Sequence, residues 1–254
     1  MSRRHFHLIL PSNSSMNVYP KNTAAQYITK LPKAIELDGD WEISLKEISI
    51  PHVFENIAKD ECYVGFTTND NGEIRKRYVS AGYYKSLETL LQKLNCMLDD
   101  IGVTFRLRNN NRRVAVTVPD RHYLEINPRL SEFLGFGGVD NLYQGFGTFG
   151  GSEVPEMPSE REINAIYVYA DVCEEVVVGD ILVPLLRIVN VKKTKSGRMH
   201  HILYPPLYVP VQRKVFDTIE IWLMTDTGEA IPFAEGKSFV VLEFNNVGLL
   251  ENML

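Results

Sequence analysis

The chain has 254 residues, 44% of them hydrophobic, which is enough for one large β domain or two small ones. Its net charge of −5 argues against a general affinity for nucleic acid, because such binding depends on Lys and Arg at phosphate groups. No stretch approaches the ~20 apolar residues that span a bilayer, and the polar start of the chain lacks the apolar region of a signal peptide.

The three cysteines indicate a reducing compartment. Cys62, Cys96 and Cys173 are odd in number, lie far apart and show no C-x-x-C spacing. This pattern predicts neither a disulfide framework nor a zinc site. We therefore expect a protein without metal or other cofactor.

Short β-type runs separated by Pro, Gly, Asn and Asp dominate the chain, a pattern typical of a sandwich or barrel. In one of them Trp41, Ile43 and Leu45 share a strand face, but the later apolar positions shift. The shift predicts a bulge or twist near Lys46 and Glu47 before the run ends at Pro51. Further candidate strands lie at 4–10, 24–31, 62–66, 74–80, 103–107, 113–118, 122–126, 164–172 and 182–191. So many strands require two packed sheets.

Two helices are predicted in the middle of the chain. The first runs from the N-cap Ser86 to Leu98, with leucines at helical spacing, and the second is a short turn from Pro128 to Leu134 that Gly135 terminates. Strands and helices mix here, whereas the flanking regions are almost purely β. We expect an inserted α+β subdomain at about 60–136 within a larger β domain.

A glycine-rich segment follows, at 135–160, with seven glycines between 135 and 151. Three of them match G-x-G-x-x-G, but no strand precedes the match and no helix follows it, so we reject nucleotide binding. The segment favours a long loop that is mobile in the isolated subunit and becomes ordered against a neighbour. A loop packed on its own subunit is an equal alternative.

Two other segments are candidates for contacts. One segment contains a basic cluster of Lys192, Lys193, Lys195 and Arg198. Such a cluster is typical of a solvated hairpin tip, and the functional alternative is a local contact with DNA. The run from Pro205 to Pro210 is stiff and apolar and cannot be a central strand, because its prolines lack ladder donors. It either covers a sheet edge or meets a neighbouring subunit. The candidate assembly contacts are Phe136, Tyr143, Phe146, Phe149, Pro205, Pro206 and Tyr208.

The last third of the chain alternates cleanly from Phe216 to Met224, with Ile219, Ile221 and Leu223 on one face. Turn residues follow, and then an apolar run from 238 to 244. The pattern predicts a C-terminal β-hairpin.

No catalytic set emerges. His5 and His7 share one strand face, but His200 and His201 cannot both face the same way in extended chain, so a metal site would need an accidental meeting of these residues. No G-x-S-x-G elbow is present. We expect a structural protein rather than an enzyme. The alternative is a ligand- or glycan-binding β-sandwich in which Trp222 or Tyr143 stacks on a sugar.

Both ends of the chain resemble a known family. The N-terminal likeness covers Leu10–Pro20, Asn22, Thr23, Leu31, Pro32 and Leu37–His52. The C-terminal likeness covers Val183–Arg187, Tyr208–Pro210, Phe216–Ile221, Gly228–Phe233, Gly236 and Lys237. In these stretches the chain resembles the penton (minor capsid) proteins of Polinton/Maverick elements and related adintoviruses.

The resemblance implies a single jelly-roll β-sandwich, a homopentamer at the vertices of an icosahedral virion capsid, and a larger double jelly-roll major capsid protein as partner. The protein would then be made in the host cytoplasm or nucleus. No active-site signature belongs to this pattern.

Overall fold

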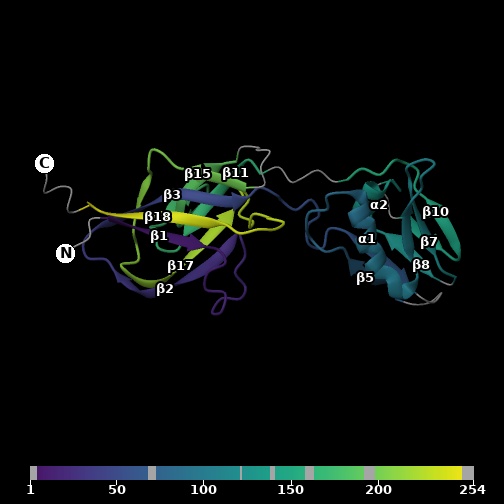
Figure 1. Cartoon of the computed structure of the whole chain (residues 1–254), viewed down its shortest axis with the longest axis horizontal. Helices are drawn as coiled ribbons and strands as arrows, with labels where there is room; N and C mark the ends of the chain where they lie inside the picture. Colours follow the sequence, from purple (N-terminus) through teal and green to yellow (C-terminus); the bar gives the residue numbers. More distant parts are fainter. Residues whose placement is uncertain are drawn as a thin grey trace. The chain divides into compact units, whose positions relative to one another are not determined.

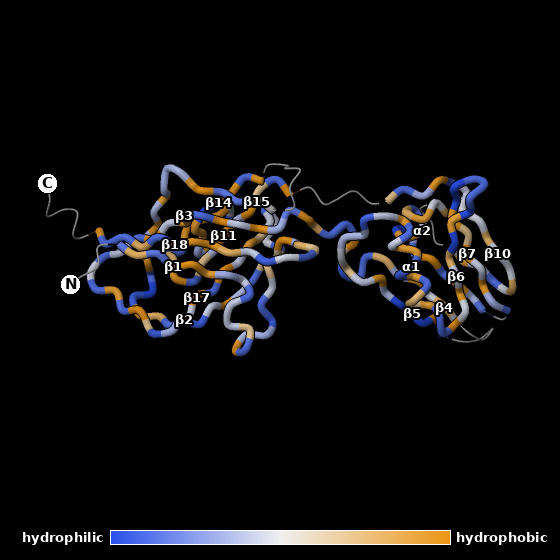
Figure 2. Tube along the Cα trace, in the orientation of Figure 1, coloured by the Kyte–Doolittle hydropathy of each residue, from blue (hydrophilic) through white to orange (hydrophobic). Residues whose placement is uncertain are grey.

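The computed structural model describes residues 5–67, 73–120, 122–137, 141–157, 163–191 and 198–247. The chain divides into two compact units (Figure 1). Unit 1 contains residues 1–54 and 162–254, and unit 2 contains residues 55–161. Each unit has its own buried core, and the apolar stretches follow the strands of each (Figure 2). No helix in the described ranges is long and apolar enough to span a membrane.

Unit 1 is a sandwich of two antiparallel sheets. One has the order β1-β18-β3-β15, with β16 also paired to β3, and the other has the order β14-β11-β17-β2. Its strands are β1 (His5–Pro11), β2 (Gln26–Glu36), β3 (Trp41–Pro51), β11 (Ala165–Ala170), β12 (Val176–Val178), β13 (Ile181–Val183), β14 (Leu185–Asn190), β15 (Arg198–Ile202), β16 (Tyr208–Pro210), β17 (Val215–Met224) and β18 (Phe239–Asn246).

The strand order is that of a jelly roll. The two chain ends pair as β1 and β18, and the orders β1-β18-β3-β15 and β2-β17-β11-β14 of the two sheets are those of a double Greek key. This confirms the predicted fold class. Between β3 and β11 the chain forms unit 2, which takes in the region 60–136 that the sequence predicted as an insertion.

The predicted C-terminal hairpin is wrong. β17 pairs with β11 and β2, whereas β18 pairs with β1 and β3, so the two strands lie in different sheets. The expected turn does form, with Gly228 at φ +79° and an Ala230 bridge back to Met224. Beyond it, however, Phe233 pairs with Phe54, and the chain crosses to the opposite sheet.

The predicted bulge in β3 is present, whereas the strand predicted at 182–191 is divided in two. The bulge in β3 is confirmed, because Glu47 faces Val241 and Leu45 faces Leu242, which leaves Lys46 without a partner on β18. The single strand predicted at 182–191 is instead divided at Pro184 into β13 and β14. A proline cannot donate to the ladder, so the break falls there.

The sandwich has two opposite edges. β1 and β2 lie together at one edge, where the Tyr27 hydroxyl donates to Leu10 O at 3.1 Å. β14 lies on the other side with the strands that flank β3, and Arg187 Nη1 donates to Pro205 O at 3.1 Å. The next sections use these two edges, named the β1–β2 edge and the β14–β16 edge.

Unit 2 is an α+β unit with two small antiparallel sheets, of order β5-β4-β8-β9 and β10-β7-β6. Both predicted helices are present, with N-caps at Ser86 and Asn127. The elements are β4 (Tyr63–Thr67), β5 (Arg75–Tyr78), α1 (Leu87–Leu98), a 3-10 turn (Asp99–Ile101), β6 (Thr104–Leu107), β7 (Val114–Val118), β8 (Tyr123–Ile126), α2 (Pro128–Leu134), β9 (Asn141–Gln144) and β10 (Gly147–Gly150).

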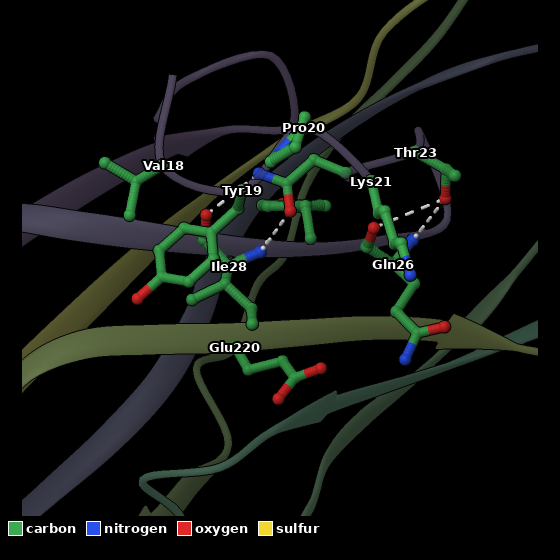
Figure 3. A pocket seen from close by; sticks show the side chains of 10 residues that line it. Val18, Tyr19, Pro20, Lys21, Thr23, Gln26, Ile28 and Glu220 are labelled. Carbon is green, nitrogen blue, oxygen red and sulfur yellow. Dashed lines mark hydrogen bonds between the residues drawn. The ribbon is translucent and has the colours of Figure 1, made fainter. Parts of the chain in front are cut away.

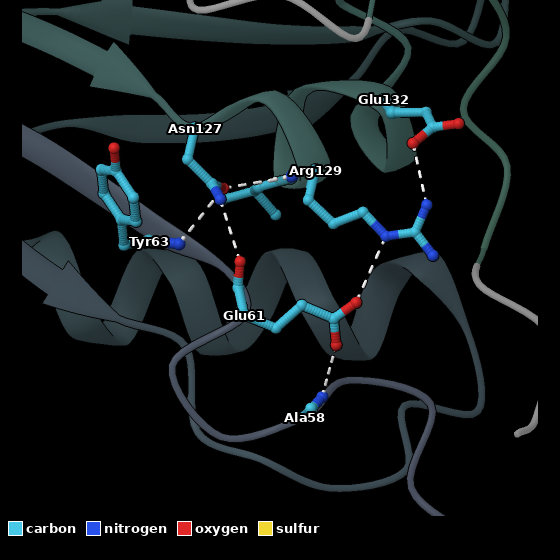
Figure 4. A network of polar contacts seen from close by, with 7 residues as sticks. Ala58, Glu61, Tyr63, Asn127, Arg129 and Glu132 are labelled. Atoms are coloured by element: carbon cyan, nitrogen blue, oxygen red, sulfur yellow. Dashed lines mark hydrogen bonds and ion pairs between the residues drawn. The ribbon is translucent and has the colours of Figure 1, made fainter.

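Asn127 ties α2 to the start of β4 (Figure 4). Its Oδ1 accepts from Leu130 N at 3.1 Å and from Tyr63 N at 3.2 Å, and its Nδ2 donates to Glu61 O at 2.9 Å. The Glu61 carboxylate in turn pairs with Arg129 at 3.2 Å. The side-chain amide therefore satisfies backbone groups that the helix end and the loop would otherwise leave open.

The glycine-rich segment is not a long loop, which corrects the prediction. It contains β9 and β10, which extend the two sheets of unit 2. The turn between them uses Gly145 at φ +79°, whose N–H donates to His122 O at 3.1 Å. Its glycines lie at sharp turns or where two backbone segments come close together. At Gly151, for example, an added Cβ would lie 2.7 Å from Gly135 O.

Candidate assembly surfaces

The proline-rich segment forms an exposed apolar patch at the β14–β16 edge. β15 and β16 both pair with β3, and the chain between them leaves the edge at the Lys46 bulge, where Leu203 N donates to Lys46 O at 2.9 Å. Ile202, Tyr204 and Leu207 are 71%, 87% and 57% exposed. We call these three side chains, with Pro205 and Pro206, the proline patch. β16 therefore covers part of the edge of β3, which was one of the two alternatives, and the proline patch faces solvent.

A second apolar patch lies close by. β12 and β13 form a two-stranded ribbon that pairs with no other described strand, and Val177, Ile181 and Leu182 on it are 71%, 55% and 62% exposed. The ribbon begins just after Glu174, whose N–H donates to Pro210 O at 2.9 Å. An isolated ribbon is marginally stable, and its apolar surface is typical of an interface.

The sequence analysis missed this ribbon, although a signal was present. Gly179 and Asp180 separate two apolar triplets, and such a pair between β-branched runs indicates a tight hairpin. Gly179 has φ +63°, as that turn requires.

The opposite, β1–β2 edge also exposes apolar side chains. Ile9 on the edge strand β1 is 67% exposed, and Val18 and Met16 in the following loop are 60% and 40% exposed. Charged residues or prolines on an edge strand hinder its pairing with another chain, and the exposed Ile9 is neither.

The loop between β1 and β2 carries the N-terminal family likeness, and its polar side chains fix its own shape. Asn22 bonds both backbone groups of Ile28, each at 2.9 Å. Ser15, at φ +58°, accepts from Lys30 N at 2.9 Å, and Ser14 bonds Thr29 at 3.1 Å. These residues therefore act as a clasp on β2.

Beside the clasp lies an open hollow of about 500 Å³ (Figure 3). Its charged lining groups are Lys21 and Glu220. Burial raises the pKa of Glu220, against hydrogen bonds from Gln26 and Trp222 that lower it, and the charge of Asp171 raises it further. The lining offers no nucleophile–base pair.

The predicted contact residues of unit 2 divide into buried and exposed groups. Phe136 is 6% exposed, and Tyr143 packs between it and Phe149, with ring centroids 5.8 and 4.8 Å apart. Burial also raises the pKa of Tyr143 to about 12. Phe146 is 80% exposed and remains available to a partner, together with Leu142 at 61%.

Tyr208 is half-buried, and its hydroxyl donates to Glu243 at 3.1 Å, so this predicted contact residue has a partner within its own chain. In the basic cluster, Lys192, Lys193 and Lys195 lie outside the described residues, and Arg198 begins β15.

Two histidines contact carboxylates, and two cysteines are buried. His7 bonds Glu243 at 2.8 Å, and His200 lies 3.4 Å from Glu47 on the surface. Burial raises the pKa values of the Cys62 and Cys173 thiols to about 12. Within the described ranges, no group of three His, Cys, Asp or Glu residues is placed to hold a metal ion.

No protein-family model and no curated protein matches the chain. Among solved structures, the chain is similar to the crystal structure of a selenomethionine-labelled mavirus penton protein. The alignment covers 96% of this chain and 100% of that chain, with 11% sequence identity and a TM-score of 0.42. The jelly-roll assignment rests on the strand order of unit 1.

Proposed function

We propose that the protein is a structural capsid protein that forms the pentameric vertex of an icosahedral virus-like particle. The observation that carries this proposal is the presence of exposed apolar side chains on both opposite edges of one jelly-roll sandwich. The family resemblance at both ends of the chain supports the same role. A larger double jelly-roll capsid protein is the expected partner, and the virion the expected location.

A closed ring needs two different surfaces on each subunit, because every subunit contacts one neighbour with each surface. The β14–β16 edge offers the proline patch and the ribbon, and the β1–β2 edge offers Ile9, Met16 and Val18. In the proposed ring, the β14–β16 edge of one subunit meets the β1–β2 edge of the next. Removing these side chains from water supplies the driving force, at about 25 cal/mol per Å² of apolar surface.

Size-exclusion chromatography with light scattering tests the proposal, followed by electron microscopy of the purified protein. We expect a species of five subunits that images as a five-fold ring. Repeating the measurement with the major capsid protein present tests whether assembly depends on it. A protein that stays monomeric or dimeric at high concentration, alone and with that partner, would refute the proposal.

The alternative of a glycan-binding sandwich receives less support. Tyr143 is half-buried and packs against two phenylalanine rings of its own unit, edge-on against Phe136 and tilted against Phe149. Trp222 is half-buried, level with Gln26 and Tyr169 of the adjacent strands. A stacking platform for a sugar needs an open ring face, which neither residue offers in full.

A further inference from the structure

The three-stranded sheet of unit 2, with the order β10-β7-β6, has an outer face made of hydroxyls, small residues and arginines. Thr104, Thr117 and Thr148 form one row across the three strands, and the hydroxyls of Thr117 and Thr148 are 3.1 Å apart. Residues two positions along share that face. The next row is therefore Arg106, Ala115 and Gly150.

A third row adds two more arginines. Arg108 N donates to Arg113 O at 2.8 Å, so the β6–β7 pairing continues beyond the strands and sets these two residues opposite each other. Arg108 lies two positions after Arg106, and Arg113 lies two positions before Ala115, so both lie on the same face. We call Thr104, Arg106, Arg108, Arg113, Thr117 and Thr148 the arginine–threonine face.

The Arg108 side chain lies across this face. A Cβ added to Gly150 would be 3.2 Å from Arg108 Nη1, so the guanidinium group lies directly over that glycine. Because β7 separates β6 from β10, the side chain passes over Ala115, which is only 4% exposed. Small residues at 115 and 150 thus form a floor that keeps the guanidinium flat against the sheet.

The three guanidinium groups have no carboxylate partner among the described residues. Arg77 and Arg129, in contrast, each pair with acidic side chains of unit 2, while no ion pair joins Arg106, Arg108 or Arg113 to the described part of the chain. Like charges directly opposite on a sheet are destabilising, so the cluster costs the folded state free energy in the absence of an anion. An anionic ligand would relieve that repulsion.

We propose that the arginine–threonine face binds a sulfated polysaccharide. Guanidinium groups bind the oxygens of sulfates in bidentate pairs, and the threonine row supplies hydrogen-bonding partners for sugar hydroxyls. Arginines in successive rows stand about 7 Å apart along the strands, which suits a chain with repeated anionic groups rather than a single small ion. This site lies in unit 2, and the proposal is independent of the pentamer.

Nucleic acid fits the same face less well. Single strands are held largely by stacking on aromatic side chains, and the rows of this face contain Thr, Arg, Ala and Gly. Duplex binding depends on neutralising many phosphates at once, and three guanidinium groups neutralise few of them. The proposal therefore commits to the polysaccharide.

The test is binding of a heparin oligosaccharide to the full chain at physiological ionic strength, by isothermal titration calorimetry. We expect binding by the natural chain, none to the fully desulfated oligosaccharide, and a loss of about tenfold or more in the double variant Arg106→Gln/Arg113→Gln. The matched control is Arg75→Gln/Lys93→Gln, which removes the same charge from exposed positions elsewhere on unit 2. It should bind like the natural chain.

A second variant separates geometry from charge. Gly150→Val keeps the net charge and suits a strand, but its side chain displaces the flexible end of Arg108. We expect it to weaken heparin binding severalfold while circular dichroism shows an unchanged fold. The proposal is overturned if the natural chain does not bind heparin, if the control variant loses as much affinity as the arginine variant, or if a short DNA duplex binds as tightly through the same arginines.

Discussion

Tyr208 donates a hydrogen bond of 3.1 Å to Oε2 of Glu243 across the intervening strand β3. The two residues both pair with Ser44, whose small side chain leaves room for the bond. Oε1 of Glu243 lies 2.8 Å from His7 and 3.4 Å from Lys46. One carboxylate thus links β16, β3 and β1 on the outer face of the sheet, and it holds the β14–β16 edge in place.

Replacing this carboxylate should loosen the edge. We expect Glu243→Gln to lower the free energy of unfolding by about 1 kcal/mol, because the amide loses the charge-assisted bonds and the site is only partly buried. Urea unfolding followed by tryptophan fluorescence measures the change. Glu36→Gln, at an exposed position of β2, is the control and should leave stability unchanged.

Comparing the natural chain with the Glu243→Gln variant also gives the pH dependence of the stability that this carboxylate contributes. Burial alone would raise the pKa of Glu243, but hydrogen bonds from His7 and Tyr208 and the charge of Lys46 outweigh it and lower the pKa below its usual 4.5. A depressed acid pKa contributes stability above the unfolded value and loses it as the pH falls through the folded value. The stability difference between the natural chain and Glu243→Gln should therefore be constant near neutral pH and shrink below about pH 4.5. A difference that grows on acidification would contradict this assignment.

The cap of α2 predicts a local loss of stability in unit 2. Asn127→Ala removes three hydrogen bonds to backbone groups and should destabilise the unit by about 1–2 kcal/mol. Amide hydrogen exchange should quicken in α2 and β4. Asn109→Ala, in the exposed β6–β7 turn, should leave those exchange rates as they are.

Local chemistry was predictable from the sequence, whereas long-range pairing was not. The bulge at Lys46, the N-cap at Ser86 and the helix start at Pro128 depend on neighbours in sequence, and all three are present. The partners of β17 and β18 depend on which sheet each strand joins. Turn residues between two strands specify a reversal of direction but not the sheet in which the second strand lies.

The candidate site shows the same division. The sequence identified Pro205 and Tyr208 as contact residues, but only the fold reveals that the proline patch shares an edge with the ribbon around Val177. Conversely, Phe136 and Phe149 suggested a partner because glycines surround them, whereas unit 2 buries Phe136 in its core and half-buries Phe149 against it. Burial by distant strands cannot be read from local composition.

This burial predicts that β9 and β10 are ordered without a partner. The amide of Gly145 should be protected from hydrogen exchange in the isolated chain, because it donates to His122 O. We expect equal protection of β9 and β10 in the free subunit and in the assembled particle. Protection that appears only on assembly would instead favour ordering against a neighbour.

The proposed ring makes a strict prediction about mixtures of variants. Leu207→Asp places a charge in the β14–β16 edge, and Ile9→Asp places one in the β1–β2 edge; both side chains are exposed, so each variant should fold. Each variant alone has one defective surface and should be monomeric by light scattering. In an equal mixture, the intact β1–β2 edge of the first variant can meet the intact β14–β16 edge of the second. One contact then forms and no ring can close, so we expect one-to-one dimers.

If the interface instead joined two copies of the same edge, one variant alone would still assemble and mixing would add nothing. Val215→Asp, on β17 and 64% exposed, is the control and should assemble as the natural chain does.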